Sequence, residues 1–159
     1  MTMFYVREGN AFREADARDV LDRARTLVHQ RFRTGARVLS QPDRTREFLS
    51  LHLGDKGYEV FGLLHLDTHH RLIAVEDLFR GTIDGASVYA REVVASVIQH
   101  RSAAVICYHN HPSGSPEPSN ADEQVTRRLR EALSLIDVRL LDHLIVGETI
   151  FSFAEHGLL

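Results

Sequence analysis

Residues 102–109, SAAVICYH, form a nearly continuous apolar run between two segments with helical spacing. An apolar run of this length predicts a buried strand, because a short strand inside a sheet has apolar neighbours on all sides. Both neighbouring segments, 88–100 and 119–135, place their apolar residues on one helical stripe. A buried strand between two amphipathic helices requires a sheet with helices packed on it. The connecting loop at 110–118 then lies where a strand ends and a helix begins, which is where ligand sites tend to form.

The remaining segments complete a mixed pattern. Residues 15–33 predict a helix that buries Val20, Leu21, Ala24, Leu27 and Val28 and stops at Gly35. Residues 42–53 predict a second helix, starting near Ser40 or Pro42. Strands are expected at 58–67 and 71–79, paired as an antiparallel hairpin, and at 138–147 and 149–155. The predicted order is ααββαβαββ, an α/β fold of the α+β type with a mixed β-sheet flanked by helices.

Composition narrows the class of protein. The chain has 159 residues, enough for one compact domain, with 43% hydrophobic and 26% charged residues. No apolar stretch is long enough to span a bilayer, and the N-terminus has no signal-peptide pattern. The single cysteine, Cys107, excludes an internal disulfide and a multi-cysteine zinc site. A cytoplasmic protein without membrane contact is therefore expected.

Charge gives weak support for nucleic-acid binding. The net charge of −3 provides no overall attraction to a polyanion. Arginines do cluster in residues 1–50 and at 127–130. Clustered arginines can recognise phosphate, but solvated helix faces are the more common explanation. DNA therefore stays an open but weakly supported partner.

The stretch CYHNHPSGSPEPSNAD, residues 107–122, holds three groups that can bind a metal. A simple reading is a strand end with two polar histidines, followed by a helix cap, Ser119-x-x-Asp122. A second reading uses the geometry of an extended chain, in which His109 and His111 point the same way. Asp122, in the first turn of the next helix, can reach the same point if the loop folds over. Two imidazoles and a carboxylate are ligands typical of catalytic zinc, Zn²⁺.

Here the stretch resembles a known family. His109-x-His111-Pro112, six residues, Ser119, two residues and Asp122 match the JAMM (MPN+) metalloprotease motif. The segments EDLFRGTIDGASVYAREVV, HNHPSG, PSNAD and LLDHLIVG are similar to the RadC-type JAB domain over residues 40–159. The resemblance implies a cytidine-deaminase-like JAB/MPN core, zinc held by His109, His111 and Asp122, and an oxyanion stabilised by Ser119. It also implies a glutamate that acts on the water bound to zinc.

Two glutamates are candidates for that general base. Glu59, in YEVFGLL, opens the first predicted strand and is followed by the E-x-x-G pattern that the resemblance implies. Glu76, in VEDLF, lies one strand later and is otherwise expected to be a solvent-exposed carboxylate at the hairpin edge. Glu59 is favoured on this resemblance. Geometry tests the choice, since a base must lie within hydrogen-bond reach of the water.

Other residues near the motif receive secondary roles. Cys107 shares the histidines' side of its strand and is expected to pack, while Tyr108 points to the opposite face. Asp142 and His143 lie on a strand expected near the site and could support the metal ligands. His65 is expected to be a hydrogen-bonded core residue, and His29, His52, His100 and His156 are expected on the surface.

The sequence thus predicts a zinc-dependent metallopeptidase or isopeptidase that acts on a peptide or protein substrate. The division expected is an N-terminal helical segment, 1–39, and a RadC-like JAB/MPN domain, 40–159. The chain resembles a short form that lacks the N-terminal helix-hairpin-helix module of longer relatives. Two alternatives remain: a nucleic-acid-binding role in DNA repair, and a JAB domain that binds metal without turnover. An edge strand or the N-terminal helix could support a homodimer.

Overall fold

The computed structural model describes residues 3–32, 42–81 and 87–159. Within these residues the chain forms the following elements: β1 (Tyr5–Glu8), β2 (Ala11–Glu14), α1 (Ala17–Arg31), α2 (Pro42–Leu53), β3 (Val60–Leu66), β4 (Leu72–Arg80), α3 (Ala90–Gln99), β5 (Ala104–Asn110), α4 (Asn120–Ser134), β6 (Arg139–Val146) and β7 (Ile150–Ser152). All nine predicted helices and strands are present, although β7 is shorter than expected. In the part of the chain described, no helix is both long enough and apolar enough to cross a membrane.

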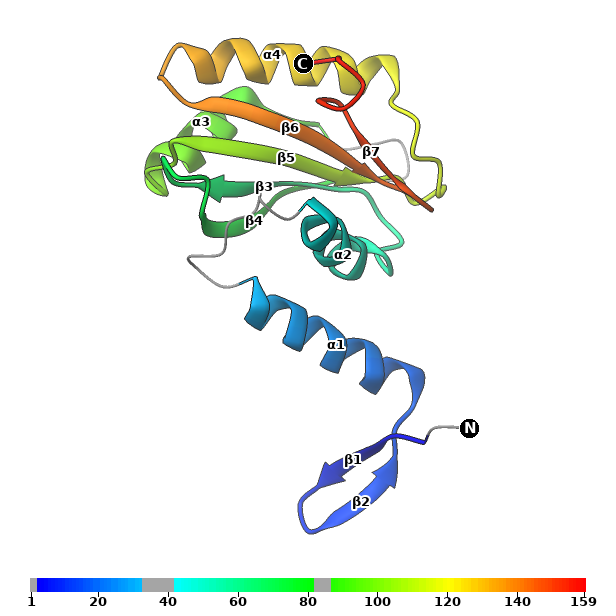
Figure 1. Cartoon of the computed structure of the whole chain (residues 1–159). Coiled ribbons are helices and arrows are strands. Elements are labelled where there is room, and N and C mark those ends of the chain that lie inside the picture. Colours follow the sequence, from blue (N-terminus) through cyan, green and yellow to red (C-terminus); the bar gives the residue numbers. More distant parts are fainter. Residues whose placement is uncertain (1–2, 33–41, 82–86) are drawn as a thin grey trace.

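Five strands form one mixed sheet in the order β4-β3-β5-β6-β7. β3 pairs antiparallel with β4 and β5, β5 pairs parallel with β6, and β6 pairs antiparallel with β7. The parallel pair is joined by α4, which crosses over one face of the sheet (Figure 1). The predicted class, an α+β fold with a mixed sheet flanked by helices, is confirmed.

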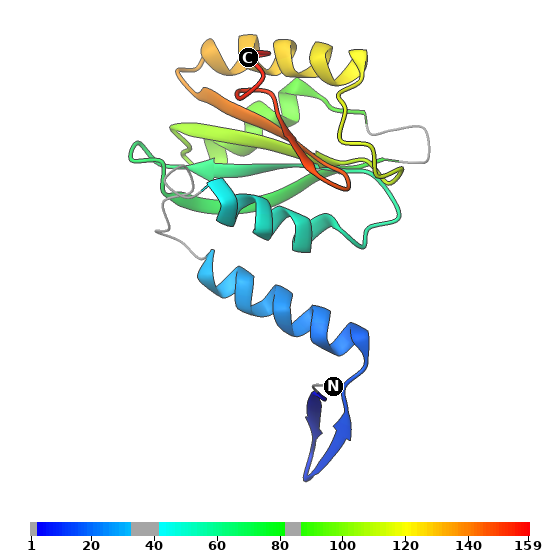
Figure 2. The same ribbon diagram turned by 45° about the vertical axis from the view of Figure 1, so that its right-hand side comes forward.

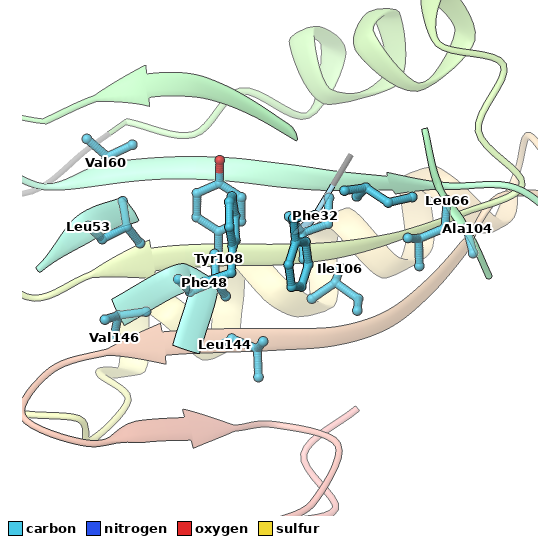
Figure 3. Close-up of a cluster of buried hydrophobic side chains, with 13 residues drawn as sticks. Phe32, Phe48, Leu53, Val60, Leu66, Ala104, Ile106, Tyr108, Leu144 and Val146 are labelled. Atoms are coloured by element: carbon cyan, nitrogen blue, oxygen red, sulfur yellow. The ribbon is translucent and has the colours of Figure 1, made fainter. Parts of the chain in front are cut away.

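Strand alternation divides the core between the two faces of the sheet. Tyr108 and Ile106 of β5 point toward α2, where they meet Phe48 and residues of β3 and β6 (Figure 3). The Tyr108 ring lies across Gly62 of β3, where an added Cβ would come within 2.4 Å of its Cζ atom. This close approach explains why a glycine is needed in the E-x-x-G pattern.

The opposite face carries the second half of the core. Cys107 and Val105 of β5 pack there with Val97 of α3 and Leu129 of α4. The predicted orientations of Cys107 and Tyr108 are therefore confirmed. Because His109 has the same parity as Cys107, its side chain enters the layer between the sheet and α4.

The N-terminal part differs from the prediction. Residues 5–14 form an antiparallel hairpin, β1–β2, which the sequence reading did not assign to any element. The hairpin lies at the far end of α1 from the sheet, and α1 contacts the rest through α2 (Figures 1 and 2). The apolar stripe of α1 is not buried as predicted, since Val20, Leu21 and Leu27 are exposed, whereas Val28 packs on the core. The expected stop at Gly35, the alternative start at Ser40 and the boundary at 39/40 lie outside the described residues.

Candidate metal centre

His109 and His111 converge at the C-terminal end of β5. His109 is the next-to-last residue of the strand and His111 directly follows it. Their Nε2 atoms lie 3.0 Å apart. His109 is buried and His111 is half-buried, so the pair opens to solvent on the His111 side.

Asp122 reaches the same point from the start of α4. Ser119 is the N-cap of this helix and Asp122 is its third residue, and the two form a reciprocal capping box. The Ser119 backbone N–H and its hydroxyl both donate to Asp122 Oδ2, each at 2.7 Å. Asp122 Oδ1 lies 3.2 Å from His109 Nε2, and Asp122 Oδ2 lies 3.4 Å from His111 Nε2. Asp122 thus caps the helix and also contacts both histidines, so the helix-cap interpretation and the metal-site interpretation of the sequence are compatible.

The proton on His111 is placed by the loop that follows it. His111 Nδ1 lies 2.9 Å from the carbonyl oxygen of Ser115, which can only accept a hydrogen bond. Nδ1 therefore carries the proton and donates it. In the neutral ring the lone pair is then on Nε2, facing His109 and Asp122.

A chain of three hydrogen bonds places the proton on His109. The Thr126 hydroxyl donates to the Asp122 carbonyl at 2.6 Å, so its oxygen accepts from His143 Nδ1, also at 2.6 Å. His143 is fully buried, and burial holds its pKa well below the usual value, so the ring is neutral and its Nε2 accepts. That acceptor lies 2.8 Å from His109 Nδ1, which must carry the proton. The lone pair of His109 is consequently on Nε2 as well.

Two lone pairs and a carboxylate therefore meet without a proton between them. A positive charge among these atoms removes their repulsion, and the smallest such charge is a proton on His111. The hydrogen bond with Asp122 accordingly raises the pKa of His111, although burial opposes this. A divalent ion is the alternative. Tetrahedral zinc, with bonds of about 2.0–2.1 Å, separates its ligand atoms by roughly 3.3–3.4 Å. The 3.0 Å between the two Nε2 atoms, and the 3.2 and 3.4 Å from these atoms to the two oxygens of Asp122, are close to this value.

The loop between β5 and α4 fits closely against the end of β6. Gly114 adopts a left-handed conformation with φ of 84°, and its carbonyl accepts from the Glu148 backbone N–H at 2.7 Å. A Cβ at Gly147 would lie 2.3 Å from the Gly114 oxygen. Gly147 thus allows the loop to approach closely enough for the Ser115 carbonyl to hold His111. Beside His111 lies an open cleft of about 260 Å³, lined in part by Lys56 and Glu148.

The two candidate bases lie in different surroundings. Glu59 directly precedes β3, and its carbonyl accepts from the Gly81 N–H. The β3–β5 register pairs Phe61 with His109, and continuing it sets Glu59 opposite His111. Glu59 is half-buried, and its charge is one of those that raise the pKa of His111.

Glu76 belongs to another cluster. Ser96 donates to Glu76 Oε2 at 2.5 Å, and His65 Nε2 lies 3.3 Å from the same oxygen. The prediction that Glu76 is a solvent-exposed carboxylate at the hairpin edge is wrong, because Glu76 is half-buried and hydrogen-bonded. His65 is buried and hydrogen-bonded, as expected, and burial and the neighbouring His100 lower its pKa to about 4.

The pair Asp142–His143 has divided roles. His143 contacts His109, whereas Asp142 accepts from the Ser152 hydroxyl and the Ala154 N–H on the other side of β6. The sequence reading missed Thr126 and Ser115. Thr126 could have been found from its spacing, four residues after Asp122 on the same helix face. Ser115 acts through its backbone carbonyl and leaves no signal in the sequence.

A mixed sheet with two histidines at a strand end and an aspartate in the next helix turn defines an α+β domain with a group of side chains that could hold a metal ion. The chain belongs to the RadC-like JAB domain family, whose model matches residues 39–158.

Three curated relatives illustrate the similarity. The chain is 59% identical over 122 residues to the UPF0758 protein Tgr7_0100 of Thioalkalivibrio sulfidiphilus. This match covers 77% of this chain and 55% of the relative. UPF0758 proteins of Shewanella frigidimarina and Shewanella amazonensis are 53% and 56% identical over 135 residues, covering 84% of this chain and 60% of each relative. The chain therefore spans somewhat over half the length of these relatives, whose names state no activity.

Proposed function

We propose that this chain is a zinc-dependent metallopeptidase of the isopeptidase type. The observation that carries the proposal is the convergence of His109 Nε2, His111 Nε2 and the Asp122 carboxylate, whose atoms lie 3.0, 3.2 and 3.4 Å apart, separations that suit one tetrahedral ion. Two imidazoles and one carboxylate form a donor set found in catalytic zinc sites. Membership of the JAB family is compatible with this chemistry.

When bound, zinc would polarise the scissile carbonyl and lower the pKa of water to about 7. Glu59 is the proposed proton carrier. Its carboxylate would take a proton from the attacking water and deliver it to the leaving amine, so that one C–N bond breaks and one C–O bond forms. Its charge, which is one of those that raise the pKa of His111, supports this role.

Ser119 is proposed to stabilise the oxyanion. Its hydroxyl donates to Asp122 Oδ2 at 2.7 Å, as does its backbone N–H. A substrate oxyanion would compete for the hydroxyl proton, while the backbone N–H would keep Asp122 in position. Replacing Ser119 by alanine should therefore reduce turnover more than it reduces metal affinity.

The test combines metal analysis with hydrolysis of fluorogenic peptides and of peptides joined through a lysine ε-amine. His111→Ala should lose the metal of this site, whereas Glu59→Gln should keep it and lose at least about 100-fold in turnover. Glu47→Gln, an exposed change on α2, is the matched control. Undiminished turnover of Glu59→Gln would reject the assigned base. Metal binding without hydrolysis of any tested bond would instead support the non-catalytic alternative.

A further inference from the structure

We propose that His65, Glu76 and His100 form a second divalent-metal site, at the other end of the same sheet face. We call these three residues the second cluster. They come from three elements: His65 from β3, Glu76 from β4 and His100 from the end of α3. The group does not depend on the proposed hydrolase activity, because none of its members touches the first cluster, His109, His111 and Asp122.

In the second cluster, as in the first, a carboxylate lies close to both imidazoles. Glu76 Oε2 lies 3.3 Å from His65 Nε2 and 3.6 Å from His100 Nδ1. At Asp122 the distances are 3.2 Å from Oδ1 to His109 and 3.4 Å from Oδ2 to His111. His65 has no exposed side-chain surface, while Glu76 and His100 are 35% and 24% exposed. The site thus has a fixed inner ligand and two outer ligands that an ion can reach from solvent.

The Nε2 atom of His65 can lose its proton and become a metal ligand while the ring stays hydrogen-bonded through Nδ1. The Ser96 hydroxyl donates to Glu76, so its oxygen accepts from His65 Nε2–H at 3.1 Å, and the Ser102 hydroxyl lies 2.8 Å from Nδ1. A hydroxyl can donate or accept. If the proton moves to Nδ1, Ser102 becomes the acceptor and Nε2 is free for a metal. Both nitrogens of this buried ring therefore keep a partner in either state.

His100 can do the same at the surface. Its Nδ1 donates to the Ser96 carbonyl at 3.0 Å, but that carbonyl also accepts the His100 backbone N–H at 3.0 Å and stays satisfied without the ring. The ring stacks on His65 with centroids 4.1 Å apart, so metal binding requires it to turn out of this stack. A partly exposed side chain at a helix end has room for this rotation, with its other nitrogen hydrogen-bonded to water.

The two clusters are too far apart to share an ion. His65 pairs with Val105, four residues along β5 from His109. At about 3.3 Å per residue this separation is roughly 13 Å. The second cluster would thus bind its own ion, of the class that imidazole and carboxylate select, such as Zn²⁺. A His₂Glu set linking β3, β4 and α3 would fasten the helix to the sheet edge.

Zinc stoichiometry on the full chain tests the proposal. We expect two equivalents of Zn²⁺ for the wild type, one for His111→Ala, one for His100→Ala and none for the double variant. Glu76→Gln, which preserves side-chain volume, should match His100→Ala, and His69→Ala, on the exposed turn, should match the wild type. The His111→Ala variant reports on the first cluster separately, so failure of either site is visible alone.

Nitrogen chemical shifts of His65 provide a second measurement. In His111→Ala without metal, we expect the proton of His65 on Nε2, and addition of Zn²⁺ should move it to Nδ1. A single equivalent in the wild type, unchanged by His100→Ala and Glu76→Gln, would overturn the proposal and identify the cluster as a hydrogen-bond network only. An unchanged His65 proton at saturating zinc would overturn it as well.

Discussion

At the scale of single residues, the first cluster depends on where protons are held. Neighbouring groups determine which ring nitrogen of each histidine carries the proton. The Ser115 carbonyl does this for His111, and Thr126 does it for His109 through His143. Partners of this kind typically change metal affinity 10- to 100-fold. The metal-binding strength of the site should therefore respond to changes that never touch the ion.

Thr126→Val tests this dependence. Without the hydroxyl, His143 Nδ1–H has no acceptor, and the ring lowers its free energy by carrying the proton on Nε2. That proton then points at His109 Nδ1, which drives the His109 proton onto Nε2, the atom that faces the metal. Zinc affinity measured by chelator competition should fall about 10- to 100-fold. Thr126→Ser, which restores the oxygen, should retain wild-type affinity; equal affinities for the two variants would refute the relay.

Gly147→Ala tests the loop contact. The new Cβ would lie 2.3 Å from the Gly114 carbonyl oxygen, a backbone atom that cannot rotate away. The loop must shift, and Ser115 then no longer holds His111. We expect a loss of about 1–3 kcal/mol in unfolding free energy, as in other overpacked sites, together with weaker zinc binding. Gly57→Ala is the control, since a Cβ there meets no atom within 4 Å. Wild-type zinc affinity in Gly147→Ala would show that the loop can move without releasing His111 from Ser115.

At the scale of elements, most of the fold could be predicted because the apolar residues of each segment repeat at the spacing of a helix or of a strand. The helices at 42–53, 88–100 and 119–135 and the five strands of the large sheet follow from apolar spacing. The hairpin β1–β2 could not be predicted, because its residues are exposed on both faces and carry no alternation. A strand without a buried side leaves no hydrophobic pattern.

The candidate site divides in the same way. His109, His111 and Asp122 could be proposed from local spacing, since an extended pair and a helix cap have known geometry. His143 could only be placed by the β5–β6 register, which pairs it with Cys107. Such pairings between distant segments are decided by packing, and no local pattern encodes them.

Asp77 of β4 joins three elements, β4, α2 and β5, and the turn after α2. The carboxylate accepts from His52 at 2.8 Å, Lys56 at 2.6 Å and the Tyr108 hydroxyl at 2.7 Å. Burial opposes its ionisation, but these hydrogen bonds outweigh burial and hold the pKa of Asp77 well below its usual value. The charged form is therefore favoured in the folded state. Its stabilisation is present above the unfolded pKa of about 3.9 and is lost as pH falls through the folded pKa.

Asp77→Asn should therefore destabilise the protein by roughly 1–3 kcal/mol at pH 7. The difference from the wild type should begin to shrink below about pH 4, where Asp77 of the unfolded chain binds a proton, and should vanish only as pH falls through the folded pKa. Urea unfolding at several pH values measures both effects. Asp137→Asn, an exposed carboxylate, is the control. A difference that stays constant from pH 7 to pH 3 would contradict the assigned role.

At the scale of the whole molecule, the N-terminal part contributes unevenly to the core. Phe32, at the end of α1, is buried and stacks on Phe48 of α2 with ring centroids 4.5 Å apart. Phe12, in the hairpin, is 70% exposed. Both residues precede the segment matched by the family model, which begins at residue 39. The bounds of the family model would place both outside the matched domain, whereas packing assigns them different roles.

A matched pair of substitutions distinguishes these roles. Phe32→Ala removes a buried ring from the α2 face of the core and should cost about 3–5 kcal/mol of unfolding free energy. Phe12→Ala removes an exposed ring and should change it by less than about 0.5 kcal/mol. Urea unfolding of both variants measures the contrast. Zinc affinity should stay constant in each, because Phe32 packs on the α2 face of the sheet and Phe12 lies in the hairpin, whereas the first cluster lies on the opposite face of the sheet. Equal, small losses of unfolding free energy would mean that the end of α1 does not stabilise the domain. Equal, large losses would mean that the hairpin unfolds cooperatively with the sheet, although β1 and β2 form a separate two-stranded sheet.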